Sequence, residues 1–326
     1  MAADRDLAVA FAIAWGTAPG RRRSGWDQQS ATGVRALRLV AESQTFERFL
    51  LTDSHPEAVR VLAANARSAP GVTVQRWDAR TPPSDPPFDY VDVDPYGSPL
   101  PFLPAAFGAL AAEGVLAVTA TDMMVLAGAQ SAACYRLYGA RPVRARLGSE
   151  GGLRILLAAI AREAARHDGG VDPLLAYVRG HHVRAYVRWR RGLRTPAPVG
   201  EIEPRAWAGP PLGGPGPFGP LWLGRLFEAE LVERLQVPPS AQEPKEVGAL
   251  LDRFRAEARV DVPFYYEPNA LARQLKEARP VPLAEFERQI RAAGFGFART
   301  HVRPEGFRTD APRSVVESIA HAGPPT

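Results

Sequence analysis

Cysteine is almost absent from this chain of 326 residues, which contains only Cys134. A single thiol excludes an intramolecular disulfide, so the sequence suits a reducing compartment such as the cytoplasm. Cys134 could serve as a nucleophile, but its helical-looking setting, Ala-Ala-Cys-Tyr-Arg, favours a packed small side chain.

Long apolar runs are also missing, and no stretch is long enough to cross a bilayer as a helix. At the amino terminus, Asp4, Arg5 and Asp6 precede the short apolar stretch 7–15, which is not the pattern of a signal peptide. We therefore expect a cytoplasmic protein without a membrane span. Hydrophobic residues make up 46% of the chain, which is enough for real cores, and the length allows two domains.

Lysine is scarce as well: only Lys245 and Lys276 occur, so arginine carries the positive charge. The formal net charge is +5 and the isoelectric point is about 9.6, which is compatible with a polyanionic partner. Arginine favours bidentate phosphate contacts, although a GC-rich genome gives the same bias.

The most informative stretch is Asp-Val-Asp-Pro-Tyr-Gly-Ser-Pro at residues 92–99. It follows 88–91, an apolar-alternating run that predicts a buried strand ending at a turn. Asp94, Pro95 and Tyr96 would then emerge at a strand's carboxyl end, where open α/β sheets bind ligands. A carboxylate and a backbone carbonyl can hold the N–H bonds of an exocyclic base amine for methylation, while the ring stacks on a base drawn out of its helix. The alternative is an ordinary Pro-Gly turn with a solvated Asp94.

Other strand ends carry polar groups at the spacing of a nucleotide cofactor site. The segment 26–35 has one glycine and begins a helical pattern, so it is no dinucleotide fingerprint, yet it can favour an anionic group. Asp53 closes the next apolar strand, where a carboxylate holds ribose hydroxyls; it also suits a helix N-cap, and both can be true. The strand 72–77 ends at Asp78 and Ala79, which can hydrogen-bond an adenine amine.

The order of elements predicts the fold class. Strands, including 114–119, alternate with helical stretches at 33–43, 55–67 and 100–112, which is typical of an α/β fold with a doubly wound, mostly parallel sheet. The first strand, 23–27, is unusually polar for such a sheet.

The carboxyl-terminal half has a different pattern. Residues 193–220 are dense in proline and glycine and predict a linker or extended insert. Helical patterns follow, with short strand candidates such as 295–302 between them, which indicates a smaller α+β domain. The expected helices are 221–235, 247–258, 270–278 and 283–293. We expect two domains, 1–220 and 221–326.

Eight segments resemble the tRNA (guanine-26 N2)-dimethyltransferase family. They occur in family order over almost the whole chain, and they are 4–7, 30–35, 94–99, 119–123, 134–139, 219–224, 263–266 and, near the end, 299–301 with 309–312. The resemblance implies a class I Rossmann-like methyltransferase that uses S-adenosylmethionine on N2 of a guanine at the junction of two tRNA stems. The smaller domain would bind tRNA.

Site residues follow from the resemblance position by position. Arg5 and Arg35 would bind the methionine part of the cofactor, and a guanidinium matches a carboxylate. Asp53 would hold the ribose, and Asp78 with Ala79 the adenine.

The same resemblance implies a catalytic group. Asp94 would be the acceptor that orients N2 and stabilises its developing positive charge. The Pro95 carbonyl would lie beside it and Tyr96 near the base. The expected reaction is in-line displacement at the sulfonium methyl, and the number of methyl groups transferred stays open.

The chain departs from the family at two further points. Many relatives carry two Cys-x-x-Cys pairs in the region of the Pro/Gly stretch, and this chain has none, so we predict no zinc. The pair His181-His182 has no nearby cysteine or carboxylate that would favour a metal. Asp4 replaces an asparagine, and an aromatic-Tyr-Asn-Pro element is missing before it. Either the true start lies upstream or the pocket lacks a wall.

Basic residues gather in three clusters, 21–23, 136–146 and 179–194, which we interpret as an RNA-facing surface. The last contains a period-two strand, 184–190. His301 suits either a structural hydrogen bond or RNA contact. Two alternatives stay open: a DNA adenine-N6 methyltransferase, and a non-catalytic RNA-binding relative.

Overall fold

The computed structural model describes residues 2–16, 23–84, 86–193, 196–212 and 214–322. A seven-stranded sheet in the order β3-β2-β1-β4-β5-β7-β6 lies at its centre. The strands are β1 (Arg23–Asp27), β2 (Phe46–Asp53), β3 (Val72–Arg76), β4 (Phe88–Val93), β5 (Leu110–Ala120), β6 (Gly169–Arg179) and β7 (His182–Arg191). Neighbours among β1 to β5 are parallel, whereas β7 pairs antiparallel with both β5 and β6. The predicted doubly wound, mostly parallel sheet is confirmed.

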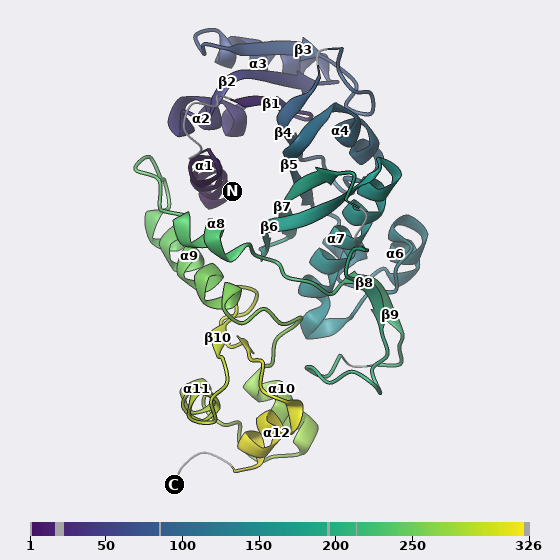
Figure 1. Cartoon of the computed structure of the whole chain (residues 1–326), viewed down its shortest axis with the longest axis vertical. Helices are drawn as coiled ribbons and strands as arrows, with labels where there is room; N and C mark the ends of the chain where they lie inside the picture. Colours follow the sequence, from purple (N-terminus) through teal and green to yellow (C-terminus); the bar gives the residue numbers. More distant parts are fainter. Residues whose placement is uncertain (1, 17–22, 85, 194–195, 213, 323–326) are drawn as a thin grey trace.

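Helices cover both faces of this sheet. From the centre, the chain adds β2 and β3 on one side of β1 and then β4 and β5 on the other side. Because the crossovers are right-handed, the connecting helices lie on opposite faces. Helix α1 packs against α2, and α4 packs against α7; Figure 1 shows the two pairs on opposite sides of the sheet. The helices are α1 (Ala2–Trp15), α2 (Val34–Ser43), α3 (Pro56–Ala66), α4 (Leu103–Ala109), α5 (Met123–Leu126), α6 (Ser131–Tyr138), α7 (Gly148–Arg166), α8 (Ala229–Arg234), α9 (Pro244–Ala258), α10 (Pro268–Leu275), α11 (Leu283–Ala292) and α12 (Arg313–Ala322).

The polar first strand is buried along its whole length. Its polar groups are paired: the Ser24 amide donates to Asp89 Oδ2 at 2.9 Å, and the Trp26 indole donates to Thr52 Oγ1 at 2.9 Å. The Arg23 guanidinium lies 3.9 Å from the centre of the Trp15 ring. Hydrogen bonds and stacking therefore replace the aliphatic packing that a central strand usually has.

Three local predictions are wrong. The helix expected over 100–112 ends at Ala109, because Leu110 already begins β5. The helix expected over 221–235 is largely a strand and a loop, since β9 (Phe218–Trp222) precedes the short α8. The strand expected over 295–302 shrinks to β10 (Ala298–Arg299), which pairs with β11 (Phe307–Arg308).

The Pro/Gly stretch is also more ordered than a linker. Within it, β8 (Val199–Ile202) pairs antiparallel with β9, and Ile202, Leu212 and Phe218 join the main hydrophobic core. Proline and glycine shape this hairpin, while its few apolar side chains anchor it against α7.

The described hydrophobic residues form two cores. The larger one runs from Ala3 to Tyr265 and so includes side chains of α8 and α9. The smaller one runs from Tyr266 to Ala320 and holds α10, α11 and α12 together at the lower end of the molecule (Figure 1). The division into domains 1–220 and 221–326 stays a prediction.

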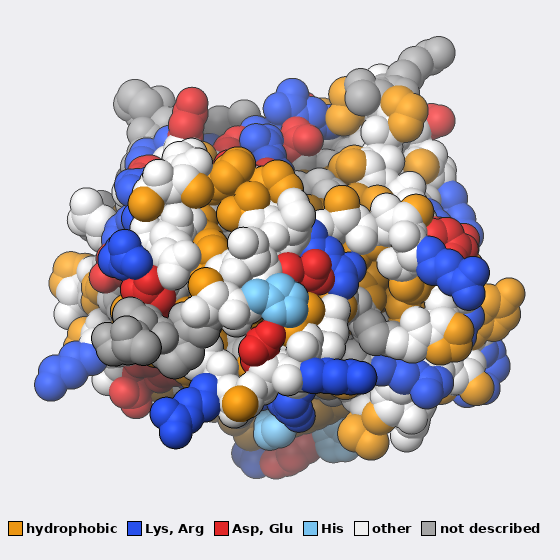
Figure 2. Space-filling view, turned by 90° about the horizontal axis from the view of Figure 1, so that it is seen from below, with side chains coloured by type: hydrophobic (Ala, Val, Ile, Leu, Met, Phe, Trp, Pro, Cys, Tyr) orange, Lys and Arg blue, Asp and Glu red, His pale blue; other side chains and the backbone are white. Residues whose placement is uncertain are grey.

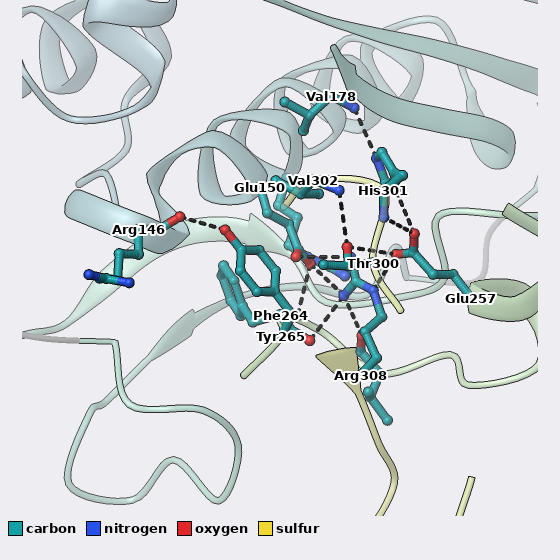
Figure 3. Close-up of polar contacts among 12 residues, drawn as sticks. Arg146, Glu150, Val178, Glu257, Phe264, Tyr265, Thr300, His301, Val302 and Arg308 are labelled. Carbon is teal, nitrogen blue, oxygen red and sulfur yellow. Dashed lines mark hydrogen bonds and ion pairs between the residues drawn. The ribbon is translucent and has the colours of Figure 1, made fainter. Parts of the chain in front are cut away.

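A buried polar cluster joins the two cores (Figure 3). Arg308 of β11 donates to both carboxylate oxygens of Glu150 on α7, at 3.0 and 2.9 Å, and to Glu257 on α9 at 2.5 Å. Glu150 also accepts from Arg154 at 2.8 Å. Burial opposes ionisation of Glu257, but His301 and Arg308 outweigh it and lower the pKa of this carboxyl to about 2.

Figure 2 shows the end of the molecule that carries the C-terminal helices. Blue Lys and Arg side chains lie there among acidic and apolar ones instead of forming one continuous basic field. Charge alone therefore does not mark this end as a site for a polyanion.

Candidate functional site

The parallel strands bring their carboxyl ends to one edge of the sheet, where the strand order reverses between β1 and β4. Such a switch point is where open α/β sheets bind their ligands. Asp27, the last residue of β1, is the register partner of Asp92 in β4. Asp53 ends β2, and Asp94 follows β4 directly. Four carboxylates therefore gather along this edge.

Arg35 lies among these carboxylates. Near the start of α2, it donates a hydrogen bond to Asp94 Oδ2 and lies 3.6 Å from Asp92 Oδ1. The Asp94 amide donates to the Gln29 side chain at 3.2 Å, which ties the motif to the β1–α2 turn. The structure thus brings two of the predicted site residues, Arg35 and Asp94, into direct contact.

A second arginine, Arg184, binds one of these carboxylates from the interior of the sheet, and it was not among the predicted site residues. Arg184 of β7 is almost fully buried, opposite Thr119 in the β5–β7 register. It donates to both oxygens of Asp92, at 3.1 and 2.7 Å, and to Thr119 Oγ1 at 2.6 Å. Burial alone would raise the pKa of Asp92, but Arg184 and Arg35 outweigh it and lower this pKa.

The pKa of Asp27 is shifted in the opposite direction from that of Asp92. It is buried beside Asp92 and Asp94, and burial together with these two carboxylates raises its pKa. Its Oδ1 has no hydrogen-bond partner among the described residues. Buried polar atoms without partners are rare in folded proteins, so each one needs an explanation.

Further unpartnered atoms lie in the β1–α2 segment. Both amide atoms of Gln28, Nε2 of Gln29 and Nε of Arg35 are buried and make no hydrogen bond within the described structure. They belong to the same turn that Asp94 contacts through Gln29. This concentration of unsatisfied donors and acceptors is what a polar ligand would relieve.

The predicted ribose and adenine residues lie farther along the same edge. Asp53 accepts from the Ala31 amide at 3.1 Å and from the His55 amide at 2.9 Å, so it anchors both the β1–α2 turn and the start of α3. The Trp77 amide donates to the Asp53 carbonyl at 3.0 Å. Asp78 is exposed, and its hydrogen bonds from Arg80 lower its pKa to about 2.

Two further predicted cofactor residues have other surroundings. Ala79 is buried directly after Asp78. Arg5 lies partly exposed on α1, which packs against α2. The role of Arg5 in cofactor binding stays a prediction.

The motif after β4 is braced by its neighbours. The Gly97 amide donates to Thr121 Oγ1 at 2.7 Å, and Ser98 Oγ lies 2.9 Å from the Tyr138 hydroxyl on α6. Pro95 is buried, whereas the Tyr96 side chain is fully exposed. These contacts hold the turn that carries Asp94, Pro95 and Tyr96 at the edge of the sheet.

Several open alternatives are resolved by burial. The His301 side chain is completely buried between Glu257 Oε1, 2.6 Å away, and the Val178 amide, which donates to it at 3.1 Å (Figure 3). Its imidazole therefore makes a structural hydrogen bond and cannot contact RNA. Cys134 is fully buried, which confirms a packed side chain, and this burial raises its pKa to about 11, which disfavours the reactive thiolate. His182 Nε2 lies 3.0 Å from Asp4 Oδ1.

The predicted basic clusters differ in whether their arginines have acidic partners. Residues 21 and 22 of the first cluster lie outside the described residues. In the described part of the cluster at 179–194, Arg191 lies over the Trp189 ring, whereas the other arginines pair with acids, and an RNA-facing role for this cluster stays a prediction. These pairs are Arg179 with Asp4 and Glu246, Arg184 with Asp92, Arg188 with Glu228, and Arg190 with Asp172.

Comparison with known proteins decides the family. The family described as "N2,N2-dimethylguanosine tRNA methyltransferase" matches residues 1–201 and 214–321. The chain belongs to this family.

Individual relatives agree. A curated tRNA (guanine(26)-N(2))-dimethyltransferase of Pyrococcus abyssi is 32% identical over 355 residues, which cover 98% of this chain and 90% of the relative. The corresponding protein of Thermococcus kodakarensis is 35% identical, with 90% and 85% covered. The solved complex of Trm1 from Pyrococcus horikoshii with S-adenosyl-L-methionine superposes with a TM-score of 0.86 at 29% identity, covering 98% of this chain and 92% of that one.

The match confirms the resemblance inferred from the sequence and the class I methyltransferase fold. The match is interrupted at residues 202–213. This internal segment lies inside the Pro/Gly stretch, which lacks the Cys-x-x-Cys pairs discussed above. Among the residues that the structure describes, no group of three or more His, Cys, Asp or Glu side chains could hold a metal ion. No described helix is long and apolar enough to cross a membrane.

Proposed function

We propose that this protein transfers a methyl group from S-adenosylmethionine to N2 of guanine 26 in tRNA. The observation that carries the proposal is the sheet edge with Asp94 and Arg35 in a chain that belongs to the dimethylguanosine tRNA methyltransferase family. The number of methyl groups added per guanine, the tRNA species and modification of position 27 stay open. A cytoplasmic location is part of the same proposal.

The residues at the edge fit the cofactor. S-adenosylmethionine would supply an electrophilic methyl group on its sulfonium. Arg35 has an unpartnered Nε that suits the methionine carboxylate, and Asp27 with its unpartnered Oδ1 suits the methionine ammonium. Arg5 would add to the binding of the methionine part from α1.

The nucleoside part of the cofactor would lie toward β2 and β3. Asp53 is held by two backbone amides, yet it stays partly exposed, so its carboxylate can accept from ribose hydroxyls. Asp78 would release Arg80 or share its oxygens to accept from the adenine amine, and the buried Ala79 would lie beside it.

Asp94 and Pro95 would receive the target base. The N2 amine of guanine is a poor nucleophile because its lone pair is delocalised into the ring. The Asp94 carboxylate and the Pro95 carbonyl would accept its N–H bonds and aim the lone pair at the methyl group. The N2–methyl bond would form as the sulfur–methyl bond breaks and S-adenosylhomocysteine leaves. Asp94 would stabilise the positive charge that develops on N2, and the N2 proton would pass to Asp94 or to water. Tyr96, fully exposed, is free to stack on the base.

The test is methylation of an unmodified tRNA transcript with this protein and S-adenosylmethionine, followed by nucleoside mass spectrometry. We expect N2-methylguanosine or its dimethyl form. In Asp94→Asn, which keeps the shape but loses the charge, we expect the rate to fall about 10²- to 10³-fold. Cofactor binding by calorimetry should persist in this variant. Methylated adenine in DNA, with none in tRNA, would instead support the DNA adenine-N6 reading, and absence of both product and cofactor binding would support the non-catalytic relative.

The predicted C-terminal tRNA-binding domain, 221–326, belongs to the same proposal. The described cores are joined by the Arg308 cluster, which would fix the C-terminal helices relative to the sheet edge.

A further inference from the structure

We propose that helix α6 and the segment after it form an RNA-docking surface beside the catalytic edge, which we call the α6 surface. Its members are the exposed Tyr135, Leu137 and Met124, with Arg136, Arg141 and Arg144. This surface would take the unstacked nucleotides and the phosphates that flank the target base. The inference rests on the proposed function only for the identity of the RNA.

The first support is the distribution of exposed apolar side chains. Large hydrophobic residues with high exposure are few in the described chain, and they are Val34, Tyr96, Met124, Tyr135 and Leu137. Four of these five lie on the segments after β4 and β5 and on α6. Tyr135 is 71% exposed and Met124 is 62% exposed. Exposed apolar side chains that gather in one region indicate an interaction site.

The second support is the connection to the catalytic turn. The Tyr138 hydroxyl, on the buried side of α6, lies 2.9 Å from Ser98 Oγ and donates to Asp122 at 2.9 Å. The Thr121 amide donates to the Gly97 carbonyl at 3.1 Å. These bonds hold α6, the start of α5 and the turn of Tyr96 together. An RNA strand that places a base at Tyr96 would therefore meet α6 next.

The third support is charge. Arg141 donates to the Gly216 carbonyl at 3.1 Å, and Arg144 donates to Ser131 Oγ at 3.1 Å. Neither of these arginines, nor Arg136, has a carboxylate partner within the described structure. Four arginines of β6 and β7 (Arg179, Arg184, Arg188 and Arg190) are instead paired with acids, and Arg191 lies over the Trp189 ring. The two clusters look alike in the sequence. In the cluster at 136–146, Arg146 pairs with Glu267, whereas Arg136, Arg141 and Arg144 keep positive charge available for phosphates.

The combination of features selects RNA as the partner. Aromatic and apolar side chains offer faces on which unpaired bases stack, and the neighbouring guanidinium groups contact phosphates in a bidentate manner. A purely apolar protein partner would leave three exposed arginines without acceptors. Figure 1 shows α6 at the outer edge of the molecule, near β8 and β9, where a long RNA can approach.

The test measures the affinity of the full chain for an unmodified tRNA transcript at several salt concentrations, in the presence of S-adenosylhomocysteine. Two variants probe the surface: Tyr135→Ala, and the double variant Arg136→Ala/Arg144→Ala. Arg190→Ala is the control for loss of positive charge, because it removes one charge from a partly exposed arginine that is paired with Asp172. Cofactor affinity is measured for each variant as a check of the fold.

We expect Tyr135→Ala to weaken tRNA binding roughly 5- to 100-fold, as loss of one stacked base does. The double variant should reduce the slope of log affinity against log salt by about 1.5, which corresponds to two lost phosphate contacts. Arg190→Ala should change neither quantity. Cofactor affinity should stay unchanged in all of them.

Wild-type affinity and salt slope in both surface variants would overturn the α6 surface, even if the enzyme methylates tRNA normally. Equal weakening by Arg190→Ala would overturn it too, because a general charge effect would then suffice. A protein that loses tRNA binding in the surface variants but never methylates tRNA would keep the surface and refute the proposed function.

Discussion

Arg184 and Asp92 form a two-point ion pair across the sheet, with Nη1 3.1 Å from Oδ1 and Nη2 2.7 Å from Oδ2. Both side chains are only 1% exposed. Asp92 in turn lies 3.6 Å from Arg35, which binds Asp94. Arg184 is too buried to reach a substrate, and it is linked to the proposed catalytic carboxylate only through Asp92 and Arg35, so we propose that it positions this carboxylate.

Removal of Arg184 alone should be costly. In Arg184→Met, Asp92 loses its buried partner, and we expect the free energy of unfolding to fall by about 3–5 kcal/mol. The double variant Arg184→Met/Asp92→Leu removes both charges, so it should be clearly more stable than the single variant. Chemical denaturation compares the two. Equal stability of the single and double variants would show that the Arg184–Asp92 pair does not contribute as proposed.

Asp27 should make stability depend on pH. Its pKa is raised in the folded protein by burial and by Asp92 and Asp94, whereas the unfolded chain ionises near the ordinary value of 3.8. The unfolded state therefore gains from ionisation first, and stability should fall as the pH rises above about 4, by up to about 1.4 kcal/mol per pH unit.

The variant Asp27→Asn removes this titration. Without cofactor, its stability relative to the wild type should increase between about pH 5 and about pH 7.5. Denaturant titrations at both pH values provide the measurement. A difference between variant and wild type that does not change with pH would show that Asp27 is already ionised in the folded protein.

Glu257 should have the opposite effect at acid pH. Its folded pKa of about 2 lies below the ordinary 4.5, because His301 and Arg308 outweigh burial. The contribution of Glu257 to stability is fully present above about pH 4.5 and is lost as the pH falls toward 2. Glu257→Gln should flatten the acid limb of the stability curve, and thermal unfolding from neutral to acid pH would reveal it.

Asp53 tests the cofactor site independently of the reaction. Asp53→Ala removes the acceptor for the Ala31 amide and for ribose hydroxyls, so we expect cofactor affinity to fall by about tenfold or more. The affinity for tRNA should stay near that of the wild type. Calorimetry with S-adenosylhomocysteine and a tRNA binding assay separate these effects. Unchanged cofactor affinity would remove Asp53 from the site.

The sequence predicts the parallel half of the sheet well, for a physical reason. Each of β2 to β5 has an apolar or alternating run followed by polar residues at or just after the strand end, and strand ends at one edge collect functional residues such as Asp53 and Asp94. The turn containing Pro95 and Tyr96 is equally local. These features depend on short segments, so a single sequence reveals them.

Contacts between residues that are far apart in the sequence could not be predicted in this way. Arg184 looks like a solvent-facing residue of a period-two strand, but β7 is inserted beside β5 and is buried on both faces. Asp27 and Asp92 become neighbours only through the β1–β4 register. The hairpin β8–β9 is hidden by its proline and glycine content, since its few buried residues show no regular spacing.

Methyl transfer to guanine 26 is the activity that the proposed function requires most directly. The decisive measurement uses two tRNA transcripts that differ only in having guanine or adenine at position 26, with isotopically labelled S-adenosylmethionine and mapping of the labelled nucleotide. We predict label on N2 of guanine 26 in the first transcript, none in the second, and a loss of at least about 100-fold in rate with Asp94→Asn. Equal labelling of both transcripts, or an Asp94→Asn enzyme as fast as the wild type, would contradict the account.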